Sequence, residues 1–258
     1  MSESSKVCLL GDSITQGLGS KKINFSGELS YLLGGSFEVV NLAYTGTMID
    51  YALKLLNEGK VAAKGSGDYC VVLYGNVDAQ IRPSRTGRVF SHIPRRYQGG
   101  GMLMPRPFYS RSIAKRAGQR FDNLQRKFFS EIIKLMDGTE QWMPLEPFTA
   151  QYAELLDRLL AMGFKVIPCS CVFIDGDLFP GTPEQYELYN RRIDALAAER
   201  SLTCVDFYSF FKKKVKKAGW DSCYNKDHFH PNGEGYRLMA ERIAVEVRKR
   251  ELCRSDAR

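Results

Sequence analysis

Short, almost continuously apolar runs alternate with amphipathic helical patterns along most of this 258-residue chain. Runs of this kind are typical of strands that are buried on both faces of a parallel sheet. They occupy residues 6–10, 37–42, 69–74, 165–170 and 203–207. The helical patterns occupy residues 25–33, 47–58, 119–136, 147–162, 184–200 and 233–250. Because crossover helices cover the two faces of a parallel sheet, the alternation predicts an α/β layer fold.

One segment departs from this alternation. Residues 79–118 contain several prolines, three consecutive glycines and no clean periodicity. Loops of this length inside a compact domain are usually functional or disordered, and the aromatic and apolar residues of this segment favour an ordered excursion. We therefore predict a single domain over residues 1–258, with an insertion or cap over about residues 79–118.

The basic character of the chain belongs to this insertion. The sequence has 37 basic and 29 acidic residues, which gives a net charge of +8. A charge run is usually a solvated face, but arginines interleaved with aromatic residues favour the binding of an anionic group. No acidic residue lies between Asp78 and Asp122, whereas ten basic residues do, namely Arg82, Arg85, Arg88, Arg95, Arg96, Arg106, Arg111, Lys115, Arg116 and Arg120.

The cysteines and the lengths of the apolar segments indicate the cellular compartment of the protein. The seven cysteines are an odd number and most lie in apolar runs, which favours buried thiols in a reducing cytoplasm over disulfides. Cys169 and Cys171 have no matching His or Cys pair nearby, so no metal site is predicted there. No secretory leader and no apolar run of about 20 residues is visible. The sequence thus predicts a cytoplasmic protein without a membrane span.

The first predicted strand ends in Gly11-Asp12-Ser13-Ile14. In doubly wound sheets, ligands bind outside the carboxyl ends of the strands, so a serine at this edge can present its hydroxyl to a substrate. The alternative is a serine that caps a helix or a turn. A serine hydroxyl is a weak nucleophile unless a base accepts its proton.

A candidate base lies near the other end of the chain, in the stretch DHFHPN. Asp227 and His230 are three residues apart, so one local turn can bring the carboxylate against the imidazole. His228 directly follows Asp227, and the side chains of such neighbours tend to diverge. Taken alone, the motif is also compatible with a surface loop that carries incidental charges.

Four short blocks occur in order, namely GDSI at 11–14, NLAYTG at 41–46, GNVD at 75–78 and DHFHP at 227–231. In this order they resemble the SGNH, or GDSL-type, hydrolase superfamily. The resemblance spans residues 6–247 of the scaffold but does not cover the basic excursion.

The resemblance implies a fold and a set of roles. The fold would be a flavodoxin-like αβα sandwich with a five-stranded parallel sheet of order 2-1-3-4-5, and the basic insertion would follow the third strand. The nucleophile would be Ser13, the acid Asp227 and the base His230. The oxyanion hole would use the backbone N–H groups of Ser13 and Gly46 together with an asparagine side chain. The resemblance implies no metal or organic cofactor.

The third block departs from the family pattern. Val77 stands where the family has its oxyanion asparagine, and Asn76 lies one position earlier. The valine side chain cannot donate a hydrogen bond, and the loss of one such donor costs about 100- to 1,000-fold in rate. Three explanations stay open: Asn76 reaches the hole, another donor such as Arg82 replaces it, or the protein is a weak or non-catalytic relative. A smaller departure is Ala43, where many members have glycine.

The predicted function is hydrolysis of acyl esters, with O-acetyl esters of a carbohydrate or another anionic, phosphate-bearing compound as the expected substrates. The residues predicted to contact the substrate are Asp12, Asp78, Arg82, Arg95 and Arg96. Two alternatives remain. One is an O-acyltransferase that uses the same acyl-enzyme, and the other is a non-catalytic glycan- or anion-binding protein on the same scaffold.

Other partners are less favoured by the sequence. No recognised nucleic-acid module accompanies the arginines, which disfavours nucleic acid as the partner. The lysine-rich residues 212–217 follow several aromatic residues and could touch an anionic membrane surface, although a solvated helix face explains them better. The sequence predicts no oligomeric state.

Overall fold

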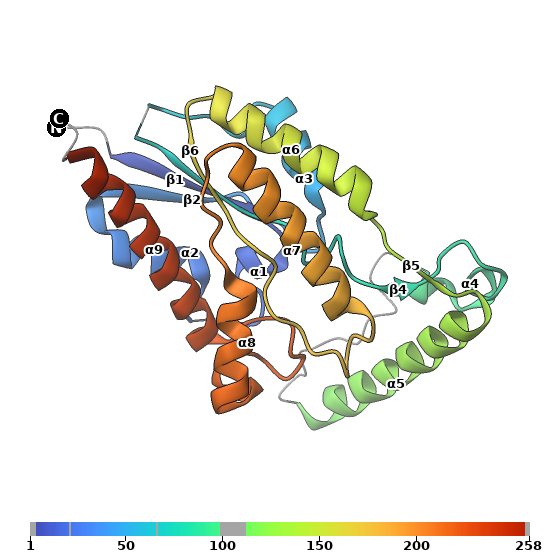
Figure 1. Cartoon of the computed structure of the whole chain (residues 1–258). Helices are drawn as coiled ribbons and strands as arrows, with labels where there is room; N and C mark the ends of the chain where they lie inside the picture. The colour runs from blue at the N-terminus through green and yellow to red at the C-terminus, as the bar shows by residue number, and fades with distance from the viewer. Residues whose placement is uncertain (1–3, 21, 66, 99–111, 256–258) are drawn as a thin grey trace. The chain divides into compact units, whose positions relative to one another are not determined.

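The computed structural model describes residues 4–20, 22–65, 67–98 and 112–255, apart from the side chains of residues 253–255 (Figure 1). The chain divides into two compact units. The core unit comprises Met1–Ala79 and Met143–Arg258, and the inserted unit comprises Gln80–Trp142. Each unit has a hydrophobic cluster of its own.

A parallel sheet forms the centre of the core unit. Its strands are β1 (Ser5–Gly11), β2 (Phe37–Asn41), β3 (Tyr69–Leu73) and β6 (Lys165–Pro168), in the order β2-β1-β3-β6. Every residue of β3 is buried, as expected for a central strand that is covered on both faces. The predicted α/β class, with a parallel sheet between helices, is confirmed.

The predicted fifth strand is reduced to a single bridge. Of residues 203–207, Val205 alone forms a parallel bridge, with Cys169 as its partner. The next residue, Asp206, is already the cap of α8 (Phe207–Ala218), and its side chain accepts a hydrogen bond from the Ser209 N–H at 2.9 Å. Because the helix begins so soon, the extended segment ends before it can form a ladder. Among the described residues, this sheet therefore has four strands, where the sequence predicts five.

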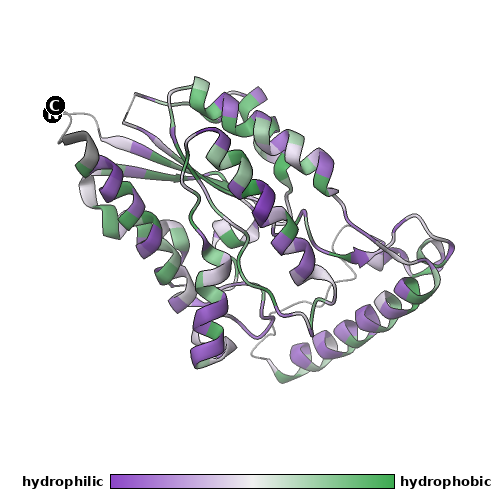
Figure 2. Cartoon of the chain, viewed as in Figure 1, coloured by the Kyte–Doolittle hydropathy of each residue, from purple (hydrophilic) through white to green (hydrophobic). Residues whose placement is uncertain are grey.

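Helices cover both faces of the sheet. On one face, α2 (Phe25–Leu33) packs against α9 (Gly233–Ser255), and on the other face α6 (Leu145–Ala161) packs against α3 (Ile49–Asn57) and α7 (Thr182–Glu199) (Figure 1). These five helices lie within a few residues of their predicted positions. Apolar and hydrophilic residues alternate along them, as amphipathic layers require (Figure 2). The short elements of this unit are α1 (Ser13–Gln16), η1 (Gly34–Ser36) and η3 (Trp220–Ser222).

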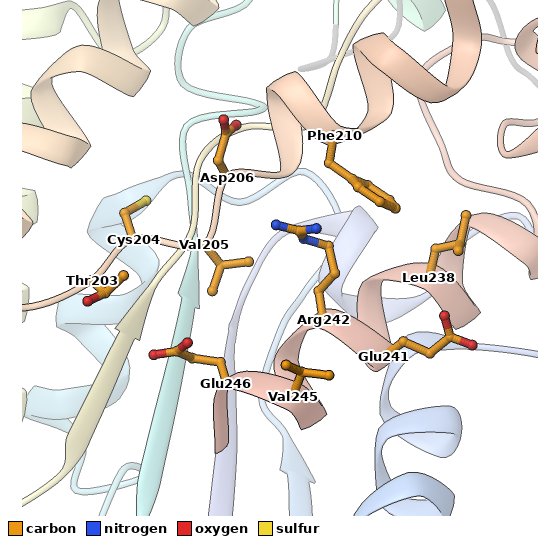
Figure 3. A pocket seen from close by; sticks show the side chains of 10 residues that line it. All are labelled: Thr203, Cys204, Val205, Asp206, Phe210, Leu238, Glu241, Arg242, Val245 and Glu246. Atoms are coloured by element: carbon orange, nitrogen blue, oxygen red, sulfur yellow. The ribbon is translucent and has the colours of Figure 1, made fainter. Parts of the chain in front are cut away.

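A cavity of about 520 Å³ lies near the short extended segment that ends at Asp206 (Figure 3). Its walls are this segment, the start of α8 and the middle of α9, including Phe210 and Leu238. The Arg242 guanidinium lies 4.6 Å from the centre of the Phe210 ring. Neither Ser13 nor His230 lines this cavity.

The inserted unit is built around one long helix. Its elements are β4 (Arg82–Pro83), α4 (Arg88–His92), η2 (Arg95–Tyr97), α5 (Ile113–Met136) and β5 (Thr139–Glu140), and β4 pairs antiparallel with β5. Helix α5 begins six residues before the predicted helix at 119–136. Residues 99–111 of the predicted insertion lie outside the described residues, and the predicted domain limits stay a prediction.

Two further findings concern disulfide bonds and membrane-spanning helices. The described cysteines are unpaired thiols, and all but the half-buried Cys204 are buried. Within the described ranges, we find no helix with the length and apolarity that a bilayer crossing requires.

Candidate active site

Ser13 stands where β1 passes directly into the single helical turn α1. The Asp12 side chain caps this turn by accepting a hydrogen bond from the Ile14 N–H at 2.9 Å. Gly17 ends the turn in the left-handed conformation, with φ of 91°. The serine is therefore held at the carboxyl edge of the sheet, where ligands bind in doubly wound folds, and it is 3% exposed.

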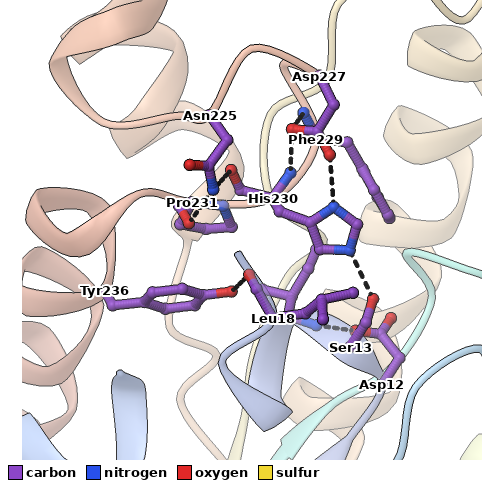
Figure 4. Close-up of polar contacts among 10 residues, drawn as sticks. Asp12, Ser13, Leu18, Asn225, Asp227, Phe229, His230, Pro231 and Tyr236 are labelled. Carbon is purple, nitrogen blue, oxygen red and sulfur yellow. Dashed lines mark hydrogen bonds and ion pairs between the residues drawn. The ribbon is translucent and has the colours of Figure 1, made fainter. Parts of the chain in front are cut away.

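A histidine and a carboxylate from the other end of the chain meet Ser13 (Figure 4). His230 Nε2 lies 2.9 Å from Ser13 Oγ, and His230 Nδ1 donates a hydrogen bond to Asp227 Oδ2 at 2.6 Å. Because the carboxylate holds the proton on Nδ1, Nε2 is left to accept from the serine hydroxyl. The three groups can therefore pass the hydroxyl proton to the imidazole.

Local hydrogen bonds hold the segment that carries the histidine (Figure 4). Asn225 Nδ2 donates to the carbonyl oxygens of His230 at 3.1 Å and Pro231 at 2.9 Å. Tyr236, at the start of α9, donates its hydroxyl to the Leu18 carbonyl at 2.7 Å. This last bond joins α9 to the loop that follows α1, so the two segments that form the site are tied together.

The predicted backbone donor Gly46 lies in an exposed turn after β2. Its φ is 75°, a left-handed conformation that favours glycine. The Thr47 N–H donates to the Tyr44 carbonyl at 3.4 Å within this turn, and the Tyr44 N–H donates to the Gly11 carbonyl at 3.2 Å. The turn is thereby fastened to the end of β1, next to Ser13. Its role in an oxyanion hole stays a prediction.

Asn76 is completely buried. Its Oδ1 accepts a hydrogen bond from the Val172 N–H at 2.9 Å, and its carbonyl oxygen accepts from the Tyr186 hydroxyl at 2.5 Å. Its Nδ2 makes no hydrogen bond of normal geometry with the described part of the chain, but it lies near enough to the Asp12 carboxyl group to lower the pKa of that group. Val77 is 3% exposed. These contacts anchor the Asn76 side chain through its oxygen, and its predicted role as an oxyanion donor stays a prediction.

Asp12, which directly precedes Ser13, and Asp78 are both completely buried. Burial raises the pKa of Asp12 to about 7, the neighbouring Asp78 adds to the rise, and the Ile14 N–H and the Asn76 side chain oppose it. Burial likewise raises the pKa of Asp78 to about 6. Asp78 accepts from the backbone N–H groups of Ile49 and Gly75, each at 2.9 Å. Both carboxyl groups thus support the loops around the site, and their predicted contact with a substrate stays a prediction.

The three predicted arginines belong to the inserted unit. Arg82 is 7% exposed, donates to Gln80 Oε1 at 2.7 Å and stacks its guanidinium 3.6 Å from the centre of the Trp142 ring. Arg95 and Arg96 are exposed in η2. The Arg96 side chain also donates to Gln125. Arg82 and Arg96 therefore make contacts within this unit. The predicted contact of the three arginines with a substrate stays a prediction.

One contact near the site, between His228 and Asp175, is not predicted by the sequence. His228 Nδ1 donates to Asp175 Oδ2 at 2.5 Å, and its ring stacks on Trp220 with centroids 4.7 Å apart. The backbone of His228 is left-handed, with φ of 49°, which is uncommon for a residue other than glycine. The pair fastens the segment before His230 to the loop after β6. The separation of 53 residues between the two partners left no sequence signal for it.

No group of three or more His, Cys, Asp or Glu side chains that could hold a metal ion occurs within the described residues. The site as described consists of a hydroxyl, an imidazole and carboxyl groups, which together support nucleophilic and acid–base chemistry.

Comparison with known proteins identifies relatives of this arrangement. A sequence model of the GDSL-like lipase/acylhydrolase family matches residues 9–238. A search of curated proteins found no significant match. The matched segment includes Ser13, Asp227 and His230.

Solved structures with the same fold cover nearly the whole chain. A lipolytic protein of the G-D-S-L family from Veillonella parvula is 17% identical, with a TM-score of 0.59 and coverage of 95% of this chain and 98% of that one. The enzyme LAE5 from the Lake Arreo metagenome is 16% identical, with a TM-score of 0.62 and coverage of 96% of both chains. The acetyl xylan esterase AlAXEase is 18% identical, with a TM-score of 0.59 and coverage of 94% and 99%. At these identities the likeness establishes the fold alone.

The raised pKa of Asp12 predicts a pH-dependent stability. The folded protein holds the Asp12 proton more tightly than the unfolded chain, whose pKa lies near 3.8, so the folded state loses stability as the pH rises from 4 to 7. Asp12→Asn keeps an oxygen for the Ile14 N–H and removes the charge. We expect the unfolding free energy of the wild type, relative to this variant, to fall by up to about 1.4 kcal/mol per pH unit, measured by urea unfolding between pH 4 and 7.

Asp78→Asn is the matched comparison for this measurement. Both oxygens of Asp78 accept backbone N–H groups, and an amide offers only one acceptor, so Asp78→Asn should be less stable than the wild type at pH 4. Because the pKa of Asp78 is itself raised to about 6, this difference in unfolding free energy should shrink as the pH rises from 4 to 6 and then stay level. Parallel pH profiles of the wild type and Asp12→Asn would contradict the assignment of the pH dependence to Asp12.

The contact between His228 and Asp175 should contribute measurably to stability. A double-mutant cycle with His228→Asn and Asp175→Ala should give a coupling energy of about 1 kcal/mol or more, measured by urea unfolding. Asparagine tolerates the left-handed backbone but is too short to reach the carboxylate.

The exposed pair Lys226 and Asp221, in the same part of the chain, provides the control for this cycle. Its side chains are 82% and 74% exposed, and its coupling should stay below about 0.5 kcal/mol. Equal coupling in the two pairs would show that the bond between His228 and Asp175 adds nothing specific.

Proposed function

The chain belongs to the GDSL-like lipase/acylhydrolase family, and on this premise we propose that it hydrolyses acyl esters through an acyl-enzyme on Ser13. The observation that carries the proposal is the pair of hydrogen bonds centred on one imidazole. Its Nε2 lies 2.9 Å from Ser13 Oγ and its Nδ1 lies 2.6 Å from Asp227 Oδ2. This is the geometry of an activated serine nucleophile.

Acylation begins at the serine hydroxyl. Ser13 Oγ attacks the ester carbonyl carbon while His230 Nε2 takes the hydroxyl proton. Asp227 stabilises the imidazolium that forms, because its carboxylate already accepts the proton on Nδ1. The imidazolium then gives its Nε2 proton to the leaving alcohol, and the acyl group stays on Ser13.

The oxyanion of the tetrahedral intermediate needs hydrogen-bond donors. The proposed donors are the N–H groups of Ser13, at the amino end of α1, and of Gly46, in the turn tied to β1. Asn76 is the proposed third donor through its buried Nδ2. Two observations support these backbone donors: Ser13 opens α1, and the turn that holds Gly46 is hydrogen-bonded to the end of β1.

Deacylation repeats these steps with water as the nucleophile. His230 Nε2 takes a proton from a water molecule, whose oxygen attacks the acyl carbon, and the proton returns to Ser13 Oγ as the free acid leaves. The cycle consumes one water and one ester and regenerates the enzyme. It needs no metal or organic cofactor.

The proposed substrate class is an O-acetyl ester of a carbohydrate that carries negative charge. Two observations support it. Structural relatives include acetyl xylan esterases, one of them from Geobacillus stearothermophilus. The exposed Arg95 and Arg96 in the inserted unit offer charge for an anionic group.

The nucleophile can be tested directly. Incubation with a fluorophosphonate, followed by intact-mass analysis, should give one adduct in the wild type and none in Ser13→Ala. Hydrolysis of 4-nitrophenyl acetate by Ser13→Ala or His230→Ala should fall at least about 1,000-fold, because removing either partner disables the other.

Product analysis separates hydrolysis from acyl transfer. The same reaction with a glycan acceptor should release free acetate as the main product. Acetylated glycan with negligible free acid would overturn the hydrolase proposal in favour of an O-acyltransferase. A folded wild-type protein that forms no adduct would overturn the catalytic proposal as a whole.

The third oxyanion donor is open to a separate test. If Val77 leaves the hole with its backbone donors alone, Val77→Asn should raise kcat about 10-fold or more with little change in KM. If Asn76 already supplies the donor, Val77→Asn should leave kcat unchanged. In that case Asn76→Leu should lower kcat, and the rise in activation free energy calculated from kcat should exceed the fall in unfolding free energy. Steady-state kinetics with 4-nitrophenyl acetate, together with urea unfolding, distinguishes the two outcomes.

A further inference from the structure

The positive charge of the protein is concentrated in the inserted unit. Residues 80–142 hold 13 basic and 4 acidic residues, a net charge of +9, whereas the rest of the chain sums to −1. Charge of one sign that is gathered on one unit attracts a polyanionic partner and repels a second copy of the same unit.

Helix α5 of this unit carries an exposed apolar stripe. Phe121 is 62% exposed, Leu124 64%, Phe128 58% and Leu135 83%. Their spacings of three, four and seven residues place them on one side of the helix, within a sector of about 60° at 100° per residue. Large apolar side chains in a contiguous exposed stripe mark an interaction surface.

The stripe is not the side of α5 that packs within its own unit. That side carries Ile133, Arg126 and Phe129, and it packs against Tyr97. Asp122 lies on the same side and forms an ion pair with Arg126 at 2.7 Å. The hydrophobic cluster of the inserted unit is therefore satisfied by one side of the helix, while a second apolar side remains exposed to solvent.

A row of basic side chains borders the stripe. Arg120, Lys127 and Lys134 follow one another at spacings of seven residues along one edge of it, so they lie on a line nearly parallel to the helix axis. One acidic side chain, Glu131, interrupts the edge and accepts a hydrogen bond from Lys134 at 3.1 Å. Apolar and hydrophilic residues are both visible along α5 in Figure 2.

We propose that α5 is a surface-binding helix that lies along an anionic lipid bilayer. The apolar stripe would enter the boundary between the headgroups and the acyl chains, and the basic row would contact the lipid phosphates. The helix lies on the membrane and does not cross it. The proposal is independent of the chemistry at Ser13, because it rests on residues of the inserted unit alone.

The observations favour lipid over two other partners. A second copy of the chain would bring two units of net charge +9 together, which opposes association. A nucleic acid would use the basic row and could stack on Phe121 and Phe128, but the aliphatic Leu124 and Leu135 offer it nothing. A bilayer uses the apolar stripe and the basic row together.

Vesicle co-sedimentation tests the proposal with the full chain. The wild type should bind vesicles of phosphatidylcholine and phosphatidylglycerol in equal parts at least ten-fold more tightly than vesicles of phosphatidylcholine alone. Phe121→Ser with Phe128→Ser should weaken binding to the anionic vesicles at least ten-fold, and Lys127→Gln with Lys134→Gln should weaken it by a similar factor, because each lysine near the surface contributes about five-fold.

Matched variants in the core unit serve as controls. Tyr31→Ser with Val245→Ser removes two side chains that are 83% and 63% exposed, and Lys213→Gln with Lys217→Gln removes two lysines from α8. Both controls should bind as the wild type does. Circular dichroism and the rate of fluorophosphonate labelling should be the same in all the variants, which separates loss of binding from loss of folding.

Four outcomes would overturn the proposal. They are equal binding to neutral and anionic vesicles, no binding to either kind, and binding that the α8 lysine control abolishes while the α5 variants retain it. The fourth is a self-associating or oligonucleotide-binding protein in which the Phe121 and Phe128 variant loses that association and vesicle binding is absent.

Discussion

Strand β1 pairs in parallel with β2 on one side and β3 on the other, and this double pairing determines where the reacting groups lie. The strand is buried from Val7 onward, so its end cannot shift without breaking two ladders. Gly11 ends it at a point where a side chain would meet the Leu73 carbonyl at 2.8 Å. Ser13 follows two residues later, and the histidine that reaches it comes from the opposite end of the chain.

The same edge of the sheet accumulates buried charge. Asp12 and Asp78 each hold loop backbone groups in place, and each has a raised pKa because water is excluded from it. A neutral side chain at either position would avoid the desolvation cost. The carboxyl groups are useful here because they accept from the N–H groups of Ile14, Ile49 and Gly75, which open or flank the loops around Ser13. The site is thus positioned at some cost in stability at neutral pH.

The sequence predicted what depends on short-range order. The strands and helices follow from local periodicity, and the contact between Asp227 and His230 follows from a spacing of three residues. The predicted fifth strand is present only as the parallel bridge between Val205 and Cys169, because Asp206 caps a helix immediately after Val205. A cap competes with an extended strand for the same residues. The contact between Asp175 and His228 and the burial of Asn76 depend on how distant loops pack, which no local pattern encodes.

The inserted unit shows the same limit in its charges. Composition alone predicted an arginine-rich cap. It could not tell which basic residues stabilise the unit internally and which remain available to bind a partner. In the structure, Arg82 stacks on Trp142 and Arg126 pairs with Asp122, so both stabilise the unit internally. The exposed apolar residues of α5 can be identified only when the buried side of the helix is known. An apolar stripe with basic residues along its edge is a property of a helix surface, and it cannot be derived from a count of arginines.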